Sequence, residues 1–468
     1  MGAALAWRLL FLLLSPRAID SADSIWYLEN AQRFADGDFL HLSGRVPPLF
    51  PALTALANLL TGDLEWAAIT VSLFASVLLI IPVYALALAM HGRPAARVAA
   101  LTVCLWPWLV DYGCRVAPEA LMSLLWFASV WMLARAVRKG GAWCVLAPLP
   151  FLGIHLTRPE GTFLWLASPF LALPLVYSDF RQGARRLVLY VLISATLLAL
   201  YLVYMRYATG EAVLSQRASA ATLHDVFFAR GLDTAKTALR LFGDVLPVML
   251  GPFLLVFAGV GLFTPRDQVR RNLALEAALL AFAAAQFVLA ALSTFAEPRY
   301  IMNTAIALSL WSAAGIAWVA QRVRGRWIRY VPVAALVALM LLGFAANVIP
   351  PLLGRMSYQP VEYKLAGRWM KENLEPGLIL CRKPQVGFYA GMPSTGPDPG
   401  DTLDGILERA KQAGTRYLVV DERYSTQLIP ALRPLLDPAN APPELRLLQS
   451  GLSPFPQARV IIYEFAEQ

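Results

Sequence analysis

The sequence predicts an all-α polytopic membrane protein with a small C-terminal α/β domain outside the membrane. The chain of 468 residues is 58% hydrophobic and only 15% charged, with a mean hydropathy of +0.55. Apolar runs of about twenty residues, the length that crosses a bilayer as a helix, recur along most of the chain. From Pro351 onwards the composition changes to that of a soluble domain. A transmembrane β-barrel would instead show shorter segments of alternating polarity.

The apolar runs define about eleven expected transmembrane helices. Their positions are 3–19, 66–90, 97–113, 118–136, 142–157, 161–178, 187–206, 241–263, 273–294, 300–320 and 330–350. We expect the first run to be a retained helix rather than a cleaved signal peptide. Arg8 lies inside this run instead of before it, and no small-residue cleavage pattern follows.

Basic residues set the expected orientation in the membrane. Alternate connections between the spans are rich in arginine and lysine, which assigns them to the cytoplasm by the positive-inside rule. They contain Arg93, Arg97, Arg135, Arg138, Lys139, Arg181, Arg185, Arg186, Arg266, Arg270, Arg271, Arg322, Arg324, Arg326 and Arg329. The N-terminus is then cytoplasmic. A transmembrane domain (1–350) with a long first outer loop (20–65) precedes an extracytoplasmic or periplasmic domain (351–468).

The net charge of +9 could suggest a nucleic-acid partner, but its distribution argues against one. The part from Leu352 carries about thirteen basic and about thirteen acidic residues, so the excess belongs to the membrane half. There it clusters in short connections between apolar runs, a pattern that reports topology in the plasma (inner) membrane. We therefore predict no nucleic-acid partner.

The C-terminal domain shows an alternation of helices and strands. Residues 361–374 and 401–414 have helical spacing, while 377–381 and 416–421 are short apolar strands followed later by two more. Asp401 is the expected N-cap of the second helix and Gly414 its stop. Because no phosphate-binding glycine motif is present, we expect an accessory domain.

The segment after the first span is acidic. Over residues 20–35, helical spacing places Asp20, Asp23, Tyr27 and Asn30 on one face. Such a stripe is a plausible wall of a site at the membrane surface. Alternatively, Asp20 or Asp23 caps a helix that lies flat on the bilayer, with its aromatic residues in the interfacial belt. The spacing alone leaves both interpretations open.

Three short outer turns each combine an arginine, a glutamate and a proline. The pairs are Arg115 with Glu119, Arg158 with Glu160 and Arg299 with Glu297. Cations are disfavoured on the outer side of a membrane, so these arginines need a reason. One is local charge pairing, which contributes little at an exposed surface. The other is an anionic ligand such as phosphate, which guanidinium binds with two parallel hydrogen bonds. Both remain open.

We predict no metal site and no cofactor. His155 has no partner histidine or cysteine at ligand spacing, which favours a buried, hydrogen-bonded histidine. The four cysteines, Cys104, Cys114, Cys144 and Cys381, are too widely spaced for a disulfide framework or a zinc site.

Taken together, these segments resemble the type C membrane glycosyltransferases that use lipid-linked sugars. Within them the chain is most similar to family 39, which includes protein mannosyltransferases, aminoarabinose transferases and a galacturonosyltransferase-like group. The resemblance rests on the order of DSIWYLENAQRFADGDF (23–39), PPLFPAL (47–53), RVAPEAL (115–121), LTRPEG (156–161) and EPRY (297–300), followed by a soluble outer tail. It implies transfer of a sugar from a polyprenyl-phosphate donor to a hydroxyl or amine, with divalent-metal dependence open.

The resemblance implies roles for residues of the first two outer loops. Asp23, followed by two aromatic residues, best matches the acidic position of the first loop, and Asp20 is the second choice. Ser24 stands where many relatives have a glutamate. Asp23 is therefore the expected general base, because the acceptor must lose a proton as it attacks the anomeric carbon. Tyr27 lines the site, and Glu119 of the second loop orients the acceptor or Arg115.

The resemblance also implies a phosphate-binding set. Arg158 and Glu160 match the TRPE turn of the family, and Arg299 and Tyr300 match the RY pair that opens a late span. Arginines near the lipid headgroup would stabilise the departing phosphate, with Arg299 the first candidate, Arg158 the second and Arg115 a further one. Direct displacement would invert the anomeric centre. The implied partners are the membrane, the donor, and a lipid, polysaccharide or protein acceptor of cell-envelope glycosylation.

Two other classes of protein compete with this interpretation. A polyprenyl-lipid or polysaccharide transporter or flippase would place charges near the middle of its spans. The expected spans are nearly free of acidic residues, apart from Glu276 near a cytoplasmic end. A non-catalytic scaffold would have no need for three outer arginine–glutamate turns.

Overall fold

The computed structural model describes residues 1–41, 46–176, 180–210, 231–263, 272–293, 295–325, 327–356, 359–398 and 400–466. Among the basic residues used above for orientation, Arg266, Arg270, Arg271 and Arg326 lie outside these ranges. The described chain divides into two compact units. The helical unit comprises Met1–Leu9 and Leu28–Phe344, and the α/β unit comprises Leu10–Tyr27 and Ala345–Gln468. The boundary expected between residues 350 and 351 stays a prediction.

Helices make up the first unit, as predicted. They are α1 (Gly2–Leu14), α2 (Ala22–Ala35), α3 (Leu49–Thr61), α4 (Leu64–Leu78), α5 (Ile80–His91), α6 (Arg93–Leu105), α7 (Pro107–Tyr112), α8 (Glu119–Lys139), α9 (Ala142–Leu146), α10 (Pro148–His155), α11 (Gly161–Leu171), α12 (Leu173–Val176), α13 (Phe180–Thr209), α15 (Gly231–Arg240), α16 (Leu246–Phe263), α17 (Leu273–Leu292), α18 (Pro298–Arg322) and α19 (Val331–Leu352). Within the described ranges, seven helical stretches are long and apolar enough to cross a membrane. The chain is thus a multi-pass membrane protein, and its exact number of spans stays a prediction.

Prolines break several of the expected continuous spans. Residues 97–113 form α6 and α7, which are separated at Trp106, where the backbone is extended (φ −61°, ψ 118°). The residue before a proline is disfavoured in the helical conformation, and Pro107 follows directly. A second break lies inside the expected span 241–263, where Gly251 before Pro252 has a non-helical backbone (φ 69°, ψ 161°).

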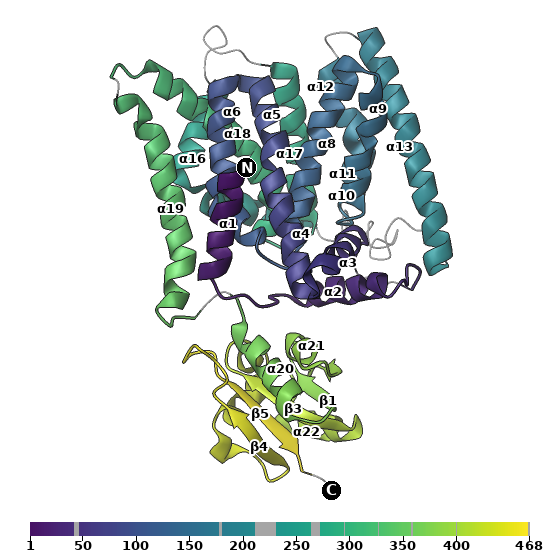
Figure 1. Ribbon diagram of the computed structural model, residues 1–468, viewed down its shortest axis with the longest axis vertical. Coiled ribbons are helices and arrows are strands. Elements are labelled where there is room, and N and C mark those ends of the chain that lie inside the picture. Colours follow the sequence, from purple (N-terminus) through teal and green to yellow (C-terminus); the bar gives the residue numbers. More distant parts are fainter. Residues whose placement is uncertain are drawn as a thin grey trace. The chain divides into compact units, whose positions relative to one another are not determined.

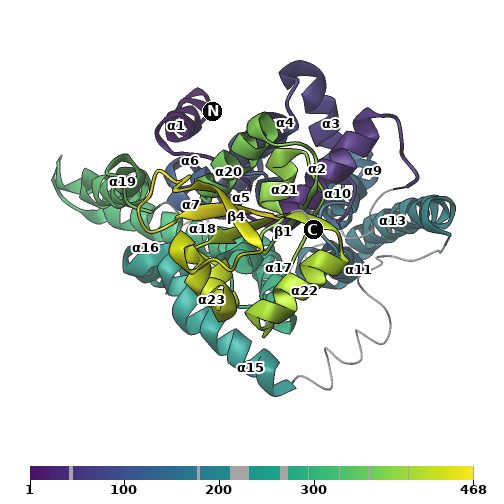
Figure 2. The ribbon, with the colours of Figure 1, turned by 90° about the horizontal axis from the view of Figure 1, so that it is seen from below.

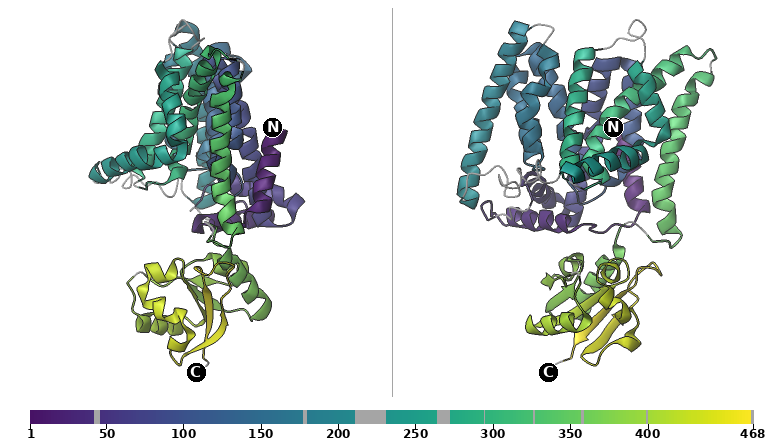
Figure 3. Two further views of the ribbon diagram at one scale, coloured as in Figure 1. Left: turned by 90° about the vertical axis from the view of Figure 1, so that its left-hand side faces the viewer. Right: turned by 180° about the vertical axis from the view of Figure 1, so that it is seen from behind.

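Helix α18 lies in the interior of the helical unit. In its most apolar stretch 89% of the residues are buried, against 6% for α13, which runs along an edge (Figure 1; Figure 3, right). Close contact with α16 depends on two glycines. A Cβ at Gly261 would collide with the Trp311 carbonyl oxygen, and one at Gly315 with the Phe257 carbonyl oxygen. Small residues let membrane helices approach to this distance. The rigid interior helix begins at the turn that carries Arg299.

Arg8 fastens α1 to the helical unit. Its guanidinium is fully buried and donates to Ser76 Oγ of α4 (2.6 Å) and to the carbonyl oxygens of Cys104 (3.1 Å) and Val103 (3.3 Å) of α6. A buried arginine is costly unless its donors are satisfied, and these bonds supply acceptors from two other helices. The charge inside the first apolar run therefore has a packing role.

The α/β unit contains the predicted alternation around a five-stranded sheet. Its strands, in the order β2-β1-β3-β5-β4, are β1 (Leu378–Cys381), β2 (Ser394–Thr395), β3 (Thr415–Asp421), β4 (Leu445–Ser450) and β5 (Val460–Phe465). Helices α20 (Val361–Asn373) and α21 (Gln385–Ala390) cover one face, and α22 (Leu403–Gln412) and α23 (Ser425–Leu428) lie on the other (Figure 2). The predicted fold class is confirmed.

Side-chain alternation builds a core on both faces of this sheet. Val419 and Ile462 belong to the core beneath α20, whereas Leu418 and Ile461 belong to the core beneath α22. One detail of the prediction is wrong, because the N-cap of α22 is Thr402, whose hydroxyl accepts from the Gly405 amide, rather than Asp401. Asp401 instead forms an ion pair with Arg409 of the same helix. The predicted stop at Gly414 is confirmed by its left-handed backbone (φ 66°).

Candidate functional site

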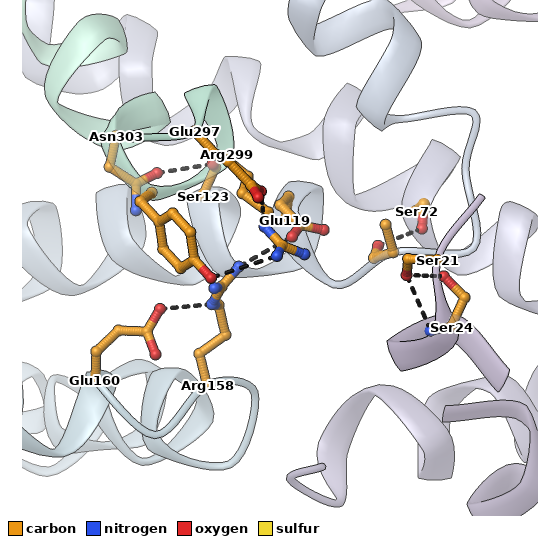
Figure 4. A network of polar contacts seen from close by, with 12 residues as sticks. Ser21, Ser24, Ser72, Glu119, Ser123, Arg158, Glu160, Glu297, Arg299 and Asn303 are labelled. Carbon is orange, nitrogen blue, oxygen red and sulfur yellow. Dashed lines mark hydrogen bonds and ion pairs between the residues drawn. The ribbon is translucent and has the colours of Figure 1, made fainter. Parts of the chain in front are cut away.

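The acidic segment after α1 forms a helix, as predicted. Helix α2 begins at Ala22, and the hydroxyl of Ser21 accepts from the backbone N–H of Ser24 (3.2 Å; Figure 4). Ser21 therefore occupies the capping position, for which Asp20 and Asp23 were candidates. Asp23 lies in the first turn, where the helix dipole favours a negative charge, and Tyr27 is buried one turn later.

A cluster of arginines and carboxylates gathers at the starts of several helices of the helical unit. Arg158, in the turn between α10 and α11, donates to Glu119 Oε1 (2.9 Å) and to Glu160 Oε1 (2.6 Å; Figure 4). Only 12% of the Arg158 side chain is exposed, and only 5% of the Glu119 side chain. Because Glu119 is the first residue of α8, this one guanidinium joins two segments that are far apart in sequence.

Arg299 extends the cluster from the start of α18. Its Nε lies 2.7 Å from Glu297 Oε2, and its guanidinium donates to the hydroxyl of Tyr300 (3.3 Å). The ring of Tyr300 contacts two cations: the guanidinium carbon of Arg299 lies 5.0 Å and that of Arg158 5.2 Å from its centroid. Stacking on an aromatic face orients a guanidinium without consuming its hydrogen-bond donors.

Buried polar contacts one turn inside each helix hold this geometry. Ser123 Oγ of α8 donates to Asn303 Oδ1 of α18 (2.7 Å; Figure 4). Ser123 is four positions after Glu119, and Asn303 is four positions after Arg299. Gln286 of α17 donates to the carbonyl oxygen of Tyr300 (3.2 Å). The starts of α8 and α18 are therefore fixed beside each other before any ligand arrives.

The turn that carries Arg158 is stiffened from both sides. The Arg158 amide donates to the Ile154 carbonyl (2.9 Å), and His155 Nδ1 lies 2.6 Å from Thr162 Oγ1 across the turn. A Cβ at Gly161 would lie 2.6 Å from the Ile154 carbonyl oxygen, so only glycine fits there. The expectation of a buried, hydrogen-bonded His155 is confirmed.

The neighbouring segments also meet this turn. The Leu49 amide, at the start of α3 in the proline-rich segment, donates to the Leu156 carbonyl (2.9 Å). Arg115 forms an ion pair with Asp111 and lies over the ring of Tyr112. The structure thus gives Arg115 the partner Asp111 and gives Glu119 the partner Arg158, a pairing that the local order of residues did not predict.

One carboxylate oxygen of the cluster is unused. Glu119 Oε2 is buried, yet it accepts no hydrogen bond from the described residues. A buried acceptor without a donor costs free energy, and such groups in a native structure call for a ligand or a water. Because Arg158 holds the other oxygen of the same carboxylate, Glu119 Oε2 points in a fixed direction.

The predicted site residues are distributed over the two units. Glu119, Arg158, Glu160, Arg299 and Tyr300 form one cluster in the helical unit, which also contains Arg115, whereas Asp20, Asp23 and Tyr27 belong to the α/β unit. Sequence reasoning missed Ser123 and Asn303. The signal was available, since each is a small polar residue about one helical turn after a charged candidate on a mainly apolar helix.

Across the described ranges, histidine, cysteine and acidic side chains form no group of three that could hold a metal ion. None of the four cysteines, all within the described ranges, forms a disulfide. Metal and cofactor requirements stay predictions.

The architecture and this cluster define a class of fold. The structure matches that of ArnT from Cupriavidus metallidurans bound to undecaprenyl phosphate, with a TM-score of 0.59 and 16% identity over 98% of this chain and 96% of the other. It matches the oligosaccharyltransferase of Archaeoglobus fulgidus with a TM-score of 0.60 and 14% identity over 91% and 70% of the two chains. A match to the arabinofuranosyltransferase AftD from Mycobacteria has a TM-score of 0.51 and 16% identity, over 100% of this chain and 41% of that one.

The protein therefore has the type C glycosyltransferase fold, as the sequence resemblance implied. Residues 45–207 match the family model described as dolichyl-phosphate-mannose-protein mannosyltransferase, a stretch that contains Glu119, Arg158 and Glu160. No curated protein sequence matches the chain significantly.

Proposed function

We propose that the protein is a membrane glycosyltransferase that moves a sugar from a polyprenyl phosphate donor to an acceptor hydroxyl or amine on the outer face of the plasma membrane. The observation that carries the proposal is the gathering of Arg158 and Arg299 around Tyr300, at the starts of rigid helices. Two cations held in this way suit an anionic headgroup better than isolated surface ion pairs do.

The arginines would act on the leaving group. As the bond between the anomeric carbon and the phosphate oxygen breaks, negative charge grows on the lipid phosphate, and a preorganised cation lowers the energy of that state. Arg299 is the first candidate because it lies in the first turn of α18, where the helix dipole also favours an anion. Arg158 and the hydroxyl of Tyr300 are the second set of contacts.

The acceptor would be activated by a carboxylate. Asp23 takes the proton of the acceptor hydroxyl or amine as its oxygen or nitrogen bonds to the anomeric carbon, while the carbon–phosphate oxygen bond breaks and the lipid phosphate departs with the electron pair. Attack opposite the leaving group inverts the anomeric centre. Glu119 Oε2, buried and without a donor in the described chain, is proposed to accept a hydrogen bond from the acceptor. Asp20, Glu160 and Arg115 support this arrangement.

The ligands bound to two structural neighbours support the substrate classes in this proposal. ArnT was solved with undecaprenyl phosphate, and the archaeal oligosaccharyltransferase was solved with a tethered acceptor peptide. These ligands support a polyprenyl-linked donor for this site. The proposed acceptor is a lipid, a polysaccharide or a protein. The proposal assigns the N-terminus to the cytoplasm and the α/β domain to the extracytoplasmic side, and it assigns no cofactor.

The placement of carboxylates disfavours a transporter or flippase. The buried carboxylates of the long described helices α4, α8 and α17 are Glu65, Glu119 and Glu276, and each lies in the first turn of its helix. Coupling sites of transporters typically lie near the midplane instead.

Binding of undecaprenyl phosphate to purified protein in nanodiscs tests the phosphate site. We expect Arg299→Gln to weaken binding by about tenfold or more, since one charge-assisted contact is lost. Arg329→Gln is the matched control, because Arg329 also donates to the hydroxyl of the following tyrosine (3.0 Å) but is exposed. Equal losses in both variants would remove the cluster as the phosphate site.

Sugar transfer from a panel of polyprenyl phosphosugars tests the base. We expect Asp23→Asn to lose about a hundredfold or more in kcat, the usual scale for removing a general base. Equal turnover by wild type and variant would remove Asp23 from this role. A reporter fused after Leu352 that proved cytoplasmic would contradict the orientation.

A further inference from the structure

The connection between α1 and α2 packs inside the α/β unit, to which it belongs. Ile19 is fully buried, and its backbone N–H donates to the hydroxyl of Tyr389 on α21 (2.9 Å). A side chain that is 370 residues away in sequence thus satisfies one backbone donor of an irregular segment. Buried irregular backbone needs such partners, because it has no ladder or helix to supply them.

A second side chain of the same unit holds the same segment. Lys364 Nζ on α20 donates to the carbonyl oxygen of Arg17 (3.4 Å), and this ammonium lies 5.4 Å from the centroid of the Tyr389 ring. The guanidinium of Arg17 in turn lies over the ring of Phe11 (4.5 Å). Two backbone groups, two residues apart, are therefore held by neighbouring side chains of α20 and α21.

Tyr389 is itself held rigidly. A Cβ at Gly367 of α20 would lie 2.5 Å from Tyr389 Cβ and 2.6 Å from the Val386 carbonyl oxygen, so α20 and α21 are in the closest contact that glycine permits. The Tyr389 ring also meets the edge of Phe388 (centroids 5.6 Å apart). The Tyr389 hydroxyl, which accepts the hydrogen bond from the Ile19 amide, therefore has a fixed position in the folded domain.

Helix α2, which carries Asp23, begins three residues after Ile19. Ser21, the cap of α2, is two residues beyond Ile19, and Asp23 is four residues beyond it. Because α2 continues without a break to Ala35, a shift of the Ile19 backbone moves the first helical turn with it.

We propose that Tyr389 is a positioning residue, through which the C-terminal domain fixes the first turn of α2 and thereby the carboxylate of Asp23. The inference rests on the proposed function, since it gives the soluble domain a part in transfer. It assigns the domain more than an accessory role. Tyr389 touches the backbone rather than the donor or acceptor, so its loss should lower kcat and leave the KM for the donor unchanged.

The test compares Tyr389→Phe with Tyr417→Phe in the full-length protein. Both substitutions remove one tyrosine hydroxyl from the α/β unit, and the Tyr417 hydroxyl donates to the Glu375 carbonyl (2.9 Å), away from the connection. Amide hydrogen exchange of residues 17–24 and the kinetics of transfer from a polyprenyl phosphosugar are measured for each. Lys364→Met and Lys371→Met form a second pair on α20, in which Lys371 is exposed.

We expect Tyr389→Phe to speed exchange of residues 17–24 by about tenfold and to lower kcat by about ten- to a hundredfold, because small misplacements of a reacting group have effects of that size. Tyr417→Phe should change neither. Unchanged exchange, or faster exchange with unchanged kcat, would overturn the proposal. If the wild type transferred no sugar, the proposed function would fail, while the exchange comparison would still decide whether Tyr389 holds this segment.

Discussion

Each unit of the molecule buries an arginine–glutamate pair, and the two pairs differ in how the guanidinium is arranged against the carboxylates. In the α/β unit, both oxygens of Glu362 face one guanidinium: Oε1 lies 2.5 Å from Arg423 Nε in an ion pair, and Oε2 accepts a hydrogen bond from a second nitrogen of Arg423 at 3.2 Å. In the helical unit, Arg158 is shared between two carboxylates, and one oxygen of Glu119 is left without a donor from the described chain. A pair in which one guanidinium faces both oxygens of a single carboxylate, here called saturated, suits a structural role. A guanidinium that is shared between two carboxylates suits a ligand site.

Removing charge from the saturated pair should have the largest effect on stability. Glu362→Gln removes the carboxylate charge that faces the buried Arg423 guanidinium, and breaking a buried pair in this way costs about 3–5 kcal/mol. We expect hydrogen exchange across β3 and β5 of the full-length protein to accelerate accordingly. Glu119→Gln is the comparison, and it should leave exchange of the helices around it nearly unchanged while lowering transfer. A comparable stability loss in both variants would erase the distinction.

The shared pair should instead dominate activity. Arg158→Lys keeps a cation but loses the planar fork that reaches Glu119 and Glu160 together and lies over Tyr300. We expect a fall in kcat for sugar transfer of about a hundredfold, the scale of losing one preorganised contact to a developing anion. Arg459→Lys, in an exposed pair of the α/β unit, is the control and should transfer at the wild-type rate. A fully active Arg158→Lys would show that the cluster serves packing alone.

The fold was largely predictable because hydrophobic length and turn chemistry act locally. Helix α2, the strands of the α/β unit and the stop at Gly414 all follow from spacing and from backbone preferences that a single segment contains. The cap of α22 shows the limit, since Asp401 and Thr402 are both good capping residues. Only the tertiary partner, Arg409, explains why Asp401 is used elsewhere.

The site was predictable in its membership but not in its pairing. Charged residues on the turns that are expected to be outer stand out, because membrane proteins seldom place arginine on that side, and this identified Arg158 and Arg299. Which carboxylate meets which arginine depends on how α8, α11 and α18 pack, and that information is spread over contacts such as Ser123 with Asn303. The hydrogen bond between the Ile19 amide and the Tyr389 hydroxyl joins segments 370 residues apart, and no local sequence pattern predicts it.

The stiffness of the Arg158 turn offers a subtler way to sharpen the comparison. Gly161→Ala keeps every charge but places a methyl group against the Ile154 carbonyl, so the turn must shift by some tenths of an ångström. We expect kcat to fall by about tenfold, because misplacing a catalytic contact weakens it without abolishing it. Gly141→Ala changes a glycine with open space and is expected to leave kcat nearly unchanged, despite a strained backbone there. Full activity in Gly161→Ala would mean that the position of Arg158 is tolerant.

The smallest effect should come from a saturated pair that is largely open to solvent. Glu422 at the end of β3 accepts from Arg459 at 3.0 Å and 3.3 Å, and these hydrogen bonds lower the pKa of its carboxyl below the ordinary 4.5. A carboxyl whose pKa is lowered by folding contributes stability above its unfolded pKa and loses it as the pH falls through the folded value. The contribution is therefore complete at neutral pH and disappears in acid.

Glu422→Gln should flatten this part of the pH dependence. Solvent screens the pair, so we expect at most about 0.5 kcal/mol, measured as exchange protection of the β3–β5 ladder between neutral pH and about pH 3. High salt should reduce the difference between wild type and variant in the same way. If Glu422→Gln lowered stability as much as Glu362→Gln, burial would add nothing to the strength of a saturated arginine–glutamate pair in this fold.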